Sequence, residues 1–131
     1  MLLLLAELAP GVAHADTPEQ IEAKQRFSRG VEAFSKGKYE AAIEEFKASY
    51  RLRAVPVVLF NLAEAYTALA AFDEAMTYVG LYTVSAPTES LDAGQREQLS
   101  QLRERIRRAS GTIRIVDAPE GASVLIDGRD A

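Results

Sequence analysis

Few side chains of this 131-residue chain have the chemistry that a catalytic centre needs. There is no cysteine, and the single histidine is His14, close to the N-terminus. The hydroxyl groups of residues such as Ser28 and Ser49 therefore have no histidine to activate them as nucleophiles. The sequence thus offers no nucleophile and base pair for covalent catalysis.

The acidic side chains give little indication of acid–base catalysis or metal binding either. Glu44-Glu45 and Asp73-Glu74 are adjacent pairs, and neighbours on a helix point about 100° apart, usually into solvent. The sequence has neither a G-x-x-x-x-G-K-[ST] nor a G-x-G-x-x-G motif for binding phosphates. Its carboxylates are scattered, without the spacing of a calcium loop. We therefore predict no catalytic residue, no cofactor, no metal site and no enzymatic activity.

The composition and net charge of the chain limit the kinds of partner that it is expected to bind. Hydrophobic residues make up 48% of the chain and charged residues 26%, which is ordinary for a globular protein. With 15 basic and 19 acidic residues the net charge is −4. This balance argues against a nucleic-acid ligand or an anionic membrane surface. The length fits one compact domain with room for a small appendix.

The clearest pattern lies in the middle of the chain. Between residues 59 and 70, apolar side chains follow the 3.6-residue period of one helix face, which should pack on its own hairpin partner. The face comprises Leu59, Leu62, Ala63, Tyr66, Leu69 and Ala70. The pattern breaks near Ala70-Ala71 and resumes at Phe72. The sequence therefore predicts two helices joined by a tight turn.

This stretch resembles a tetratricopeptide repeat. The family order of aromatic, Asn, Leu and small residue appears as Phe60-Asn61-Leu62-Ala63, followed by Tyr66, by Phe72-Asp73-Glu74-Ala75 and by Pro87. A second copy lies upstream, because five residues have partners of similar character 33 positions later, close to the family period of about 34. The pairs are Gly30 and Ala63, Gly37 and Ala70, Tyr39 and Phe72, Ala42 and Ala75, and Phe46 and Val79. The resemblance implies a mainly α fold, an α-solenoid of two helix hairpins.

Local signals place the helices of a domain at residues 16–109. Thr17, Pro18 and Gln20 form a helix start with a capping box, and Gly37 should end that helix after about residue 35. The next helix starts at about residue 38, the third at Pro56, and the fourth covers about residues 72–83. A fifth helix at residues 90–109 should cap the open end of the solenoid. Its apolar seam is Leu91, Leu99, Leu102 and Ile106.

Two segments flank this domain. Residues 1–15, MLLLLAELAPGVAHA, have the apolar core and the small-x-small ending of a secretory signal peptide, with cleavage expected after Ala15. No basic residue precedes the leucines, so the alternatives are a start lying further upstream or an ordinary apolar helix. At residues 112–131 the period changes to two, with strands expected at residues 112–115 and 123–126 and a turn at Asp127-Gly128. Pro119-Glu120-Gly121-Ala122 between these strands resembles the start of a PEGA domain, a small β module of bacterial envelope and surface proteins.

The repeat resemblance also implies a peptide-binding groove lined by the first helix of each repeat. By carry-over, its residues are Phe27, Val31, Phe34, Phe60, Asn61 and Glu64. The family's clamp for a C-terminal carboxylate needs basic residues on the first helix, and Phe27 and Val31 occupy those positions, so we exclude it. The alternative for Phe27, Val31 and Phe34 is plain core. The arginine-rich end of the fifth helix, RERIRR, is a solvated outer face or, alternatively, a surface for acidic partners.

Together these features predict a non-catalytic, exported scaffold or adaptor, periplasmic or associated with the cell envelope. It would hold a protein or peptide in the repeat groove and contact an envelope component through the PEGA-like part. No nucleic-acid partner and no membrane span in the mature chain are expected. The alternatives are a docking domain of a larger enzyme or receptor whose active part lies beyond residue 131, and a cytoplasmic adaptor if residues 1–15 are not a signal.

Overall fold

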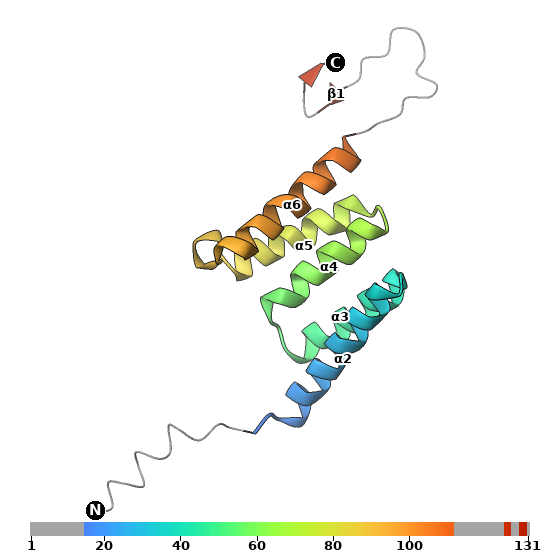
Figure 1. Cartoon of the computed structure of the whole chain (residues 1–131), viewed down its shortest axis with the longest axis vertical. Helices are drawn as coiled ribbons and strands as arrows, with labels where there is room; N and C mark the ends of the chain where they lie inside the picture. Colours follow the sequence, from blue (N-terminus) through green and yellow to red (C-terminus); the bar gives the residue numbers. More distant parts are fainter. Residues whose placement is uncertain (1–14, 112–124, 127–128, 131) are drawn as a thin grey trace, which may run out of the picture.

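A computed structural model describes residues 15–111, 125–126 and 129–130 of the chain (Figure 1). The described part is mainly helical, which confirms the predicted fold class at that level. Its elements are α2 (Pro18–Ser35), α3 (Tyr39–Leu52), α4 (Pro56–Ala68), α5 (Phe72–Ser85), the short 3-10 helix η1 (Thr88–Ser90) and α6 (Ala93–Ser110).

The helix ends follow the local signals of the sequence. At the start of α2, the backbone N–H of Gln20 donates to Thr17 Oγ1 over 3.2 Å, and the Thr17 N–H donates to Gln20 Oε1 over 2.9 Å. This is the predicted capping box. The helix ends before Gly37, whose φ of 74° lies in the left-handed region that glycine adopts without strain. Ala70 occupies the equivalent position in the turn after α4, and its φ of 57° is also in the left-handed region.

The helices form two hairpins, α2 with α3 and α4 with α5 (Figure 1). The second hairpin packs on the first through α3 and α4, and α6 lies against α5. In each hairpin the helices approach closely at small residues: Gly30, Ala42, Ala63 and Ala75 are all buried. Residues 33 positions apart in the two hairpins are thus alike in size and burial.

The buried side chains form two clusters, and α4 belongs to both. The first cluster joins α4, α5 and α6 and contains Leu59, Ala63, Ala75, Val79, Tyr82, Leu91, Leu99, Leu102 and Ile106. The second joins α3 and α4 and contains Ala42, Ile43, Phe46, Val58, Leu62 and Ala65. The apolar face expected to pack on its hairpin partner is thus divided: Leu59 and Ala63 lie in the first cluster, and Leu62 lies in the second. A helix with apolar residues on most of its circumference is buried on more than one side.

The fifth predicted helix starts later than expected. Residues 88–90 form η1, and α6 begins at Ala93. Asp92 stops the helix from extending backwards, because its carboxylate accepts from the Gln95 N–H over 2.8 Å while Gln95 Oε1 accepts from the Asp92 N–H over 2.9 Å. Leu91 therefore lies before α6 rather than within it, although its side chain is buried as predicted.

Near the C-terminus, β1 (Leu125–Ile126) pairs with β2 (Arg129–Asp130) in antiparallel register, with Leu125 opposite Asp130 and Ile126 opposite Arg129. Residues 1–14 of the predicted signal peptide, the strand predicted at residues 112–115 and the Pro119–Ala122 motif lie outside the described residues. Within the part that the structure describes, none of the helices combines the length and apolarity needed to cross a bilayer.

Candidate functional site

A cleft opens where the two hairpins meet. We call it the α2–α4 cleft, since it lies between α2, the end of α3 and the start of α4, with a volume of about 220 Å³. Its lining residues are Ala23, Lys24, Phe27, Ser28, Ser49, Arg53, Val55, Val57 and Val58. The walls are thus mostly apolar, with two hydroxyl groups and two cations and no carboxylate.

Contacts between α2 and α3 hold the floor of this cleft in place. The Phe27 ring packs on the buried Phe46 ring with centroids 5.5 Å apart. Ser49, only 2% exposed, donates from Oγ to the Ala23 carbonyl oxygen over 2.8 Å. A buried hydroxyl that is satisfied in this way fixes the two helices without leaving an unpaired polar group. Packing within the first hairpin therefore fixes the α2 and α3 walls of the cleft, and Val57 and Val58 of α4 complete it.

A second cleft adjoins the first. This α4–α6 cleft has a volume of about 360 Å³ and is lined by Val55, Pro56, Val57, Phe60, Tyr82, Ala86, Ser90, Leu91, Gln95 and Gln98. The Phe60 ring packs on the Tyr82 ring with centroids 5.4 Å apart. Burial, with a smaller contribution from the Asp92 carboxylate, raises the pKa of Tyr82, so its phenol stays neutral. Val55 and Val57 line both clefts and form a ridge between them.

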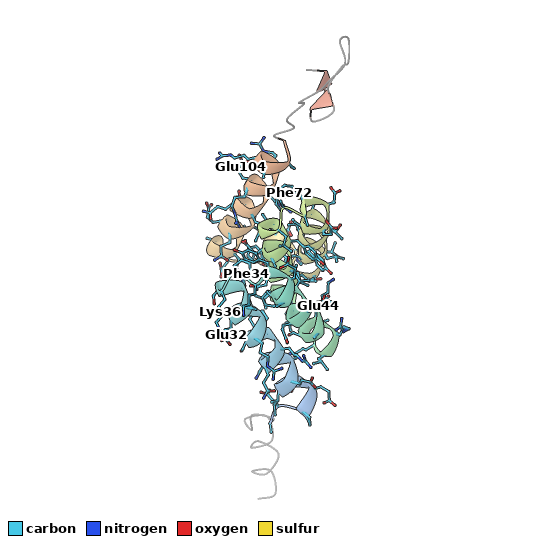
Figure 2. The ribbon with its side chains drawn as sticks, turned by 90° about the vertical axis from the view of Figure 1, so that its right-hand side faces the viewer. Glu32, Phe34, Lys36, Glu44, Phe72 and Glu104 are labelled. Carbon is cyan, nitrogen blue, oxygen red and sulfur yellow. The ribbon has the colours of Figure 1, made fainter. Side chains whose placement is uncertain are left out.

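The three groove residues predicted on α2 have different surroundings. Phe27 lines the α2–α4 cleft while packing on Phe46. Val31, one turn further along α2, is 44% exposed. Phe34 lies at the far end of the hairpin (Figure 2), where its ring meets the Tyr39 ring edge-on at 5.2 Å. Plain packing within the hairpin thus accounts for Phe34, whereas Phe27 and Val31 remain accessible to a ligand.

On α4, the three predicted groove residues are partly engaged within the protein. Phe60 lines the α4–α6 cleft. Asn61 donates from Nδ2 to the Val57 carbonyl oxygen over 2.9 Å, within its own helix, which leaves its side-chain oxygen as an acceptor. Glu64 accepts from Arg105 Nη2 over 2.6 Å and so links α4 to α6. Of the six predicted residues, the structure places Phe27 and Phe60 in adjoining clefts.

Sequence reasoning missed the two cations of the α2–α4 cleft. Lys24 lies one turn before Phe27 and Ser28 on the same side of α2, and its ammonium group forms an exposed ion pair with Asp16. Arg53 follows the end of α3, and none of the described residues forms an ion pair with it. The available sequence signal was that Lys24 precedes Phe27 by one helical turn and therefore lies on the same side of α2. No sequence signal relates Arg53 to it.

The acidic pairs and the arginine-rich end occupy other surfaces. Glu44 and Glu104 lie on different helices (Figure 2). Glu104 accepts hydrogen bonds from Arg107 and Arg108 at 2.7–2.9 Å, and these bonds lower its pKa to about 2. The described residues contain no cluster of three or more His, Cys, Asp or Glu side chains arranged to hold a metal ion.

No protein-family model, no curated protein and no solved structure matches this chain.

Proposed function

We propose that the helical part of this chain is a non-catalytic scaffold that binds a peptide segment of a protein partner. The observation that carries the proposal is the pair of adjoining, mostly apolar clefts on either side of the start of α4. Phe27 and Phe60, two residues that the repeat resemblance assigns to a peptide groove, line one cleft each. Val57, which lines both clefts, is exposed, and so is Val31, one turn beyond Phe27 on α2.

Within this proposal, the two hairpins are tetratricopeptide-like repeats and α6 is their capping helix. The small residues that recur at the two helix crossings support this assignment, as do the matching turns at Gly37 and Ala70. On the sequence motifs alone, we further propose that residues 1–15 direct export and that residues 112–131 begin a PEGA-like envelope module. N-terminal sequencing of the secreted protein should then begin at Asp16, and an intact Met1 on a cytoplasmic protein would overturn the export proposal.

The binding proposal is tested by changing the ridge without changing the core. Val57 is 51% exposed, so Val57→Asp should leave folding nearly intact, within about 0.5 kcal/mol. Val84 on α5 is 81% exposed and lines neither cleft, so Val84→Asp is the matched control. Partners are captured from an envelope extract with the wild type and with each variant, and a thermal melt accompanies each capture.

We expect Val57→Asp to lose the captured partner and Val84→Asp to retain it, with both melting temperatures close to that of the wild type. Equal capture by all three proteins would mean that the partner binds elsewhere. In the alternative, this segment is the docking domain of a larger enzyme or receptor whose active part lies beyond residue 131. That alternative uses the same groove and gives the same result, so a catalytic signature beyond residue 131 is what separates the two.

A further inference from the structure

We infer that the segment bound in the two clefts carries two apolar anchor side chains and an acidic side chain beside the first anchor. This inference rests on the proposed peptide-binding function and names the chemistry of the partner. The first anchor occupies the α2–α4 cleft, the second occupies the α4–α6 cleft, and the acid lies near Lys24 and Arg53.

The size of the first cleft selects a side chain rather than a whole small molecule. Sites for small molecules commonly enclose roughly 300–1,000 Å³, whereas the α2–α4 cleft measures about 220 Å³. Its walls at Phe27, Val57 and Val58 present carbon atoms, so the group that gains most from burial is an aliphatic or aromatic side chain. A peptide supplies such a group while its backbone stays outside.

The ridge between the clefts requires a second anchor. Val55 and Val57 contribute to both linings, so a chain that crosses the ridge passes directly from one cleft to the other. The α4–α6 cleft has no charged residue in its lining, and the packed rings of Phe60 and Tyr82 form part of its wall. The second anchor is therefore apolar as well, and the neutral side chains of Gln95 and Gln98 at this cleft favour a polar, uncharged neighbour.

Charge complementarity assigns the acid to the first cleft. The whole chain has a net charge of −4, yet the charged residues lining the α2–α4 cleft are Lys24 and Arg53 alone. The start of α4 also lies at this cleft, because Val57 of its first turn is in the lining. That turn has no acidic residue and no side-chain cap, so no side chain of α4 neutralises the positive pole of the helix dipole there. Three sources of positive potential thus surround an apolar cleft. A carboxylate can replace Asp16 as the partner of Lys24, because that ion pair is exposed and therefore weak.

The test uses the full chain and synthetic octapeptides with acetylated and amidated ends, which removes the contribution of terminal charges. One library has two leucines at varied spacing and one Asp or Glu beside the first leucine. Matched libraries replace the acid with Gln or Lys, or replace the second leucine with Ser. Binding is followed by fluorescence anisotropy and by NMR shifts of the backbone amides of Phe27, Val57 and Phe60.

We expect the acidic two-leucine peptides to bind best, to shift all three amides and to weaken as salt is raised. Lys24→Gln and Arg53→Gln should each weaken binding about threefold and together about tenfold, in line with exposed charge pairs. Lys36→Gln is the matched control: Lys36 is 57% exposed and Lys24 58%, and Lys36 lies at the other end of α2 beside Glu32 (Figure 2). This variant should bind like the wild type.

The outcomes separate the inference from the function on which it rests. Equal binding of the acidic, neutral and basic libraries would overturn the assignment of the acid and leave the peptide-binding scaffold standing. Equal binding of peptides with one and with two leucines would overturn the second anchor. Binding of no library at any spacing would overturn both the inference and the proposed function.

Discussion

The closest approach of helices in the first hairpin provides a quantitative test of the packing. A Cβ atom added at Gly30 would lie 2.5 Å from Cε1 and 2.6 Å from Cδ1 of Phe46, which is itself fully buried. Contacts this short force the ring or the helix to move. In the second hairpin the corresponding residues are Ala63, which is larger than Gly30, and Val79, which is smaller than Phe46. Both are buried in one cluster.

We therefore expect Gly30→Ala to destabilise the protein by about 1–2 kcal/mol. Overpacking of a core lowers the free energy of unfolding by about 1–3 kcal/mol. The better helix propensity of alanine offsets up to about 1 kcal/mol of that loss. Because the ring is enclosed on all sides, the upper part of the overpacking range applies. In a domain of this size, each 1 kcal/mol lowers the melting temperature by about 4–8 °C.

The assay is urea unfolding of four proteins: the wild type, Gly30→Ala, Phe46→Val and the double variant. Phe46→Val alone should cost about 2–4 kcal/mol, because it leaves a cavity and removes the partner of the Phe27 ring. In the double variant the new methyl group fills part of that cavity, as Ala63 and Val79 fit together in the other hairpin. The double variant should therefore be more stable than the sum of the single changes predicts, by about 1–3 kcal/mol.

Additive effects within about 0.5 kcal/mol would refute the packing argument, since they would show that the two sites do not interact. Gly80→Ala in α5 serves as the control. A Cβ atom there would have no neighbour within 4 Å, so this substitution should stabilise the protein by up to about 1 kcal/mol. A destabilising Gly80→Ala would contradict the helix-propensity part of the estimate.

Three further predictions concern the hairpins and α6. Ala42→Leu and Ala75→Leu should each destabilise by about 1–3 kcal/mol, because both alanines are fully buried where helices cross; unchanged thermal midpoints for both would contradict this packing. Ala70→Gly should stabilise by about 0.5–1 kcal/mol by relieving its positive φ, and Gly37→Ala should destabilise by a similar amount, both measured by chemical denaturation. Hydrogen bonds from Arg107 and Arg108 lower the pKa of Glu104 from 4.5 to about 2, so their stabilising effect is present above about pH 4.5 and is lost as the pH falls through about 2. NMR titration should place the Glu104 midpoint near 2, and Glu104→Gln should reduce the loss of stability over that range; a midpoint near 4.5 would rule out the hydrogen-bonded arrangement.

The helices were predictable because their signals are local. The capping box of Thr17 and Gln20 and the turn at Gly37 depend on residues within a few positions of one another. The start of α6 also has a local signal, since Asp92 and Gln95 have capping-box spacing. The apolar seam, which begins at Leu91, instead predicts a helix start before them. An apolar seam shows which residues are buried and does not show where the helix begins.

The clefts were less predictable because they depend on how separate helices cross. Lys24 lies on α2 and Arg53 follows the end of α3, and the two line one cleft only after the first hairpin has packed against α4. Glu64 is a predicted groove residue by carry-over from the repeat resemblance, yet its partner Arg105 comes from α6. Periodicity gives the face of a helix on which a side chain lies. The long-range partner that reaches that face depends on crossing angles and side-chain lengths.

Because α4 belongs to both buried clusters, its position affects how this domain unfolds. The first hairpin joins the rest of the helical part mainly through the contact of α3 with α4, whereas α4 also shares a cluster with α5 and α6. Loss of α2 and α3 by local unfolding would expose one side of α4, at Val58 and Leu62, and leave its other side packed. Terminal parts of a fold that pack on one side only generally open at a lower free energy than the interior. Since Phe27 and Lys24 belong to that terminal unit, a ligand in the α2–α4 cleft would slow hydrogen exchange across the whole first hairpin.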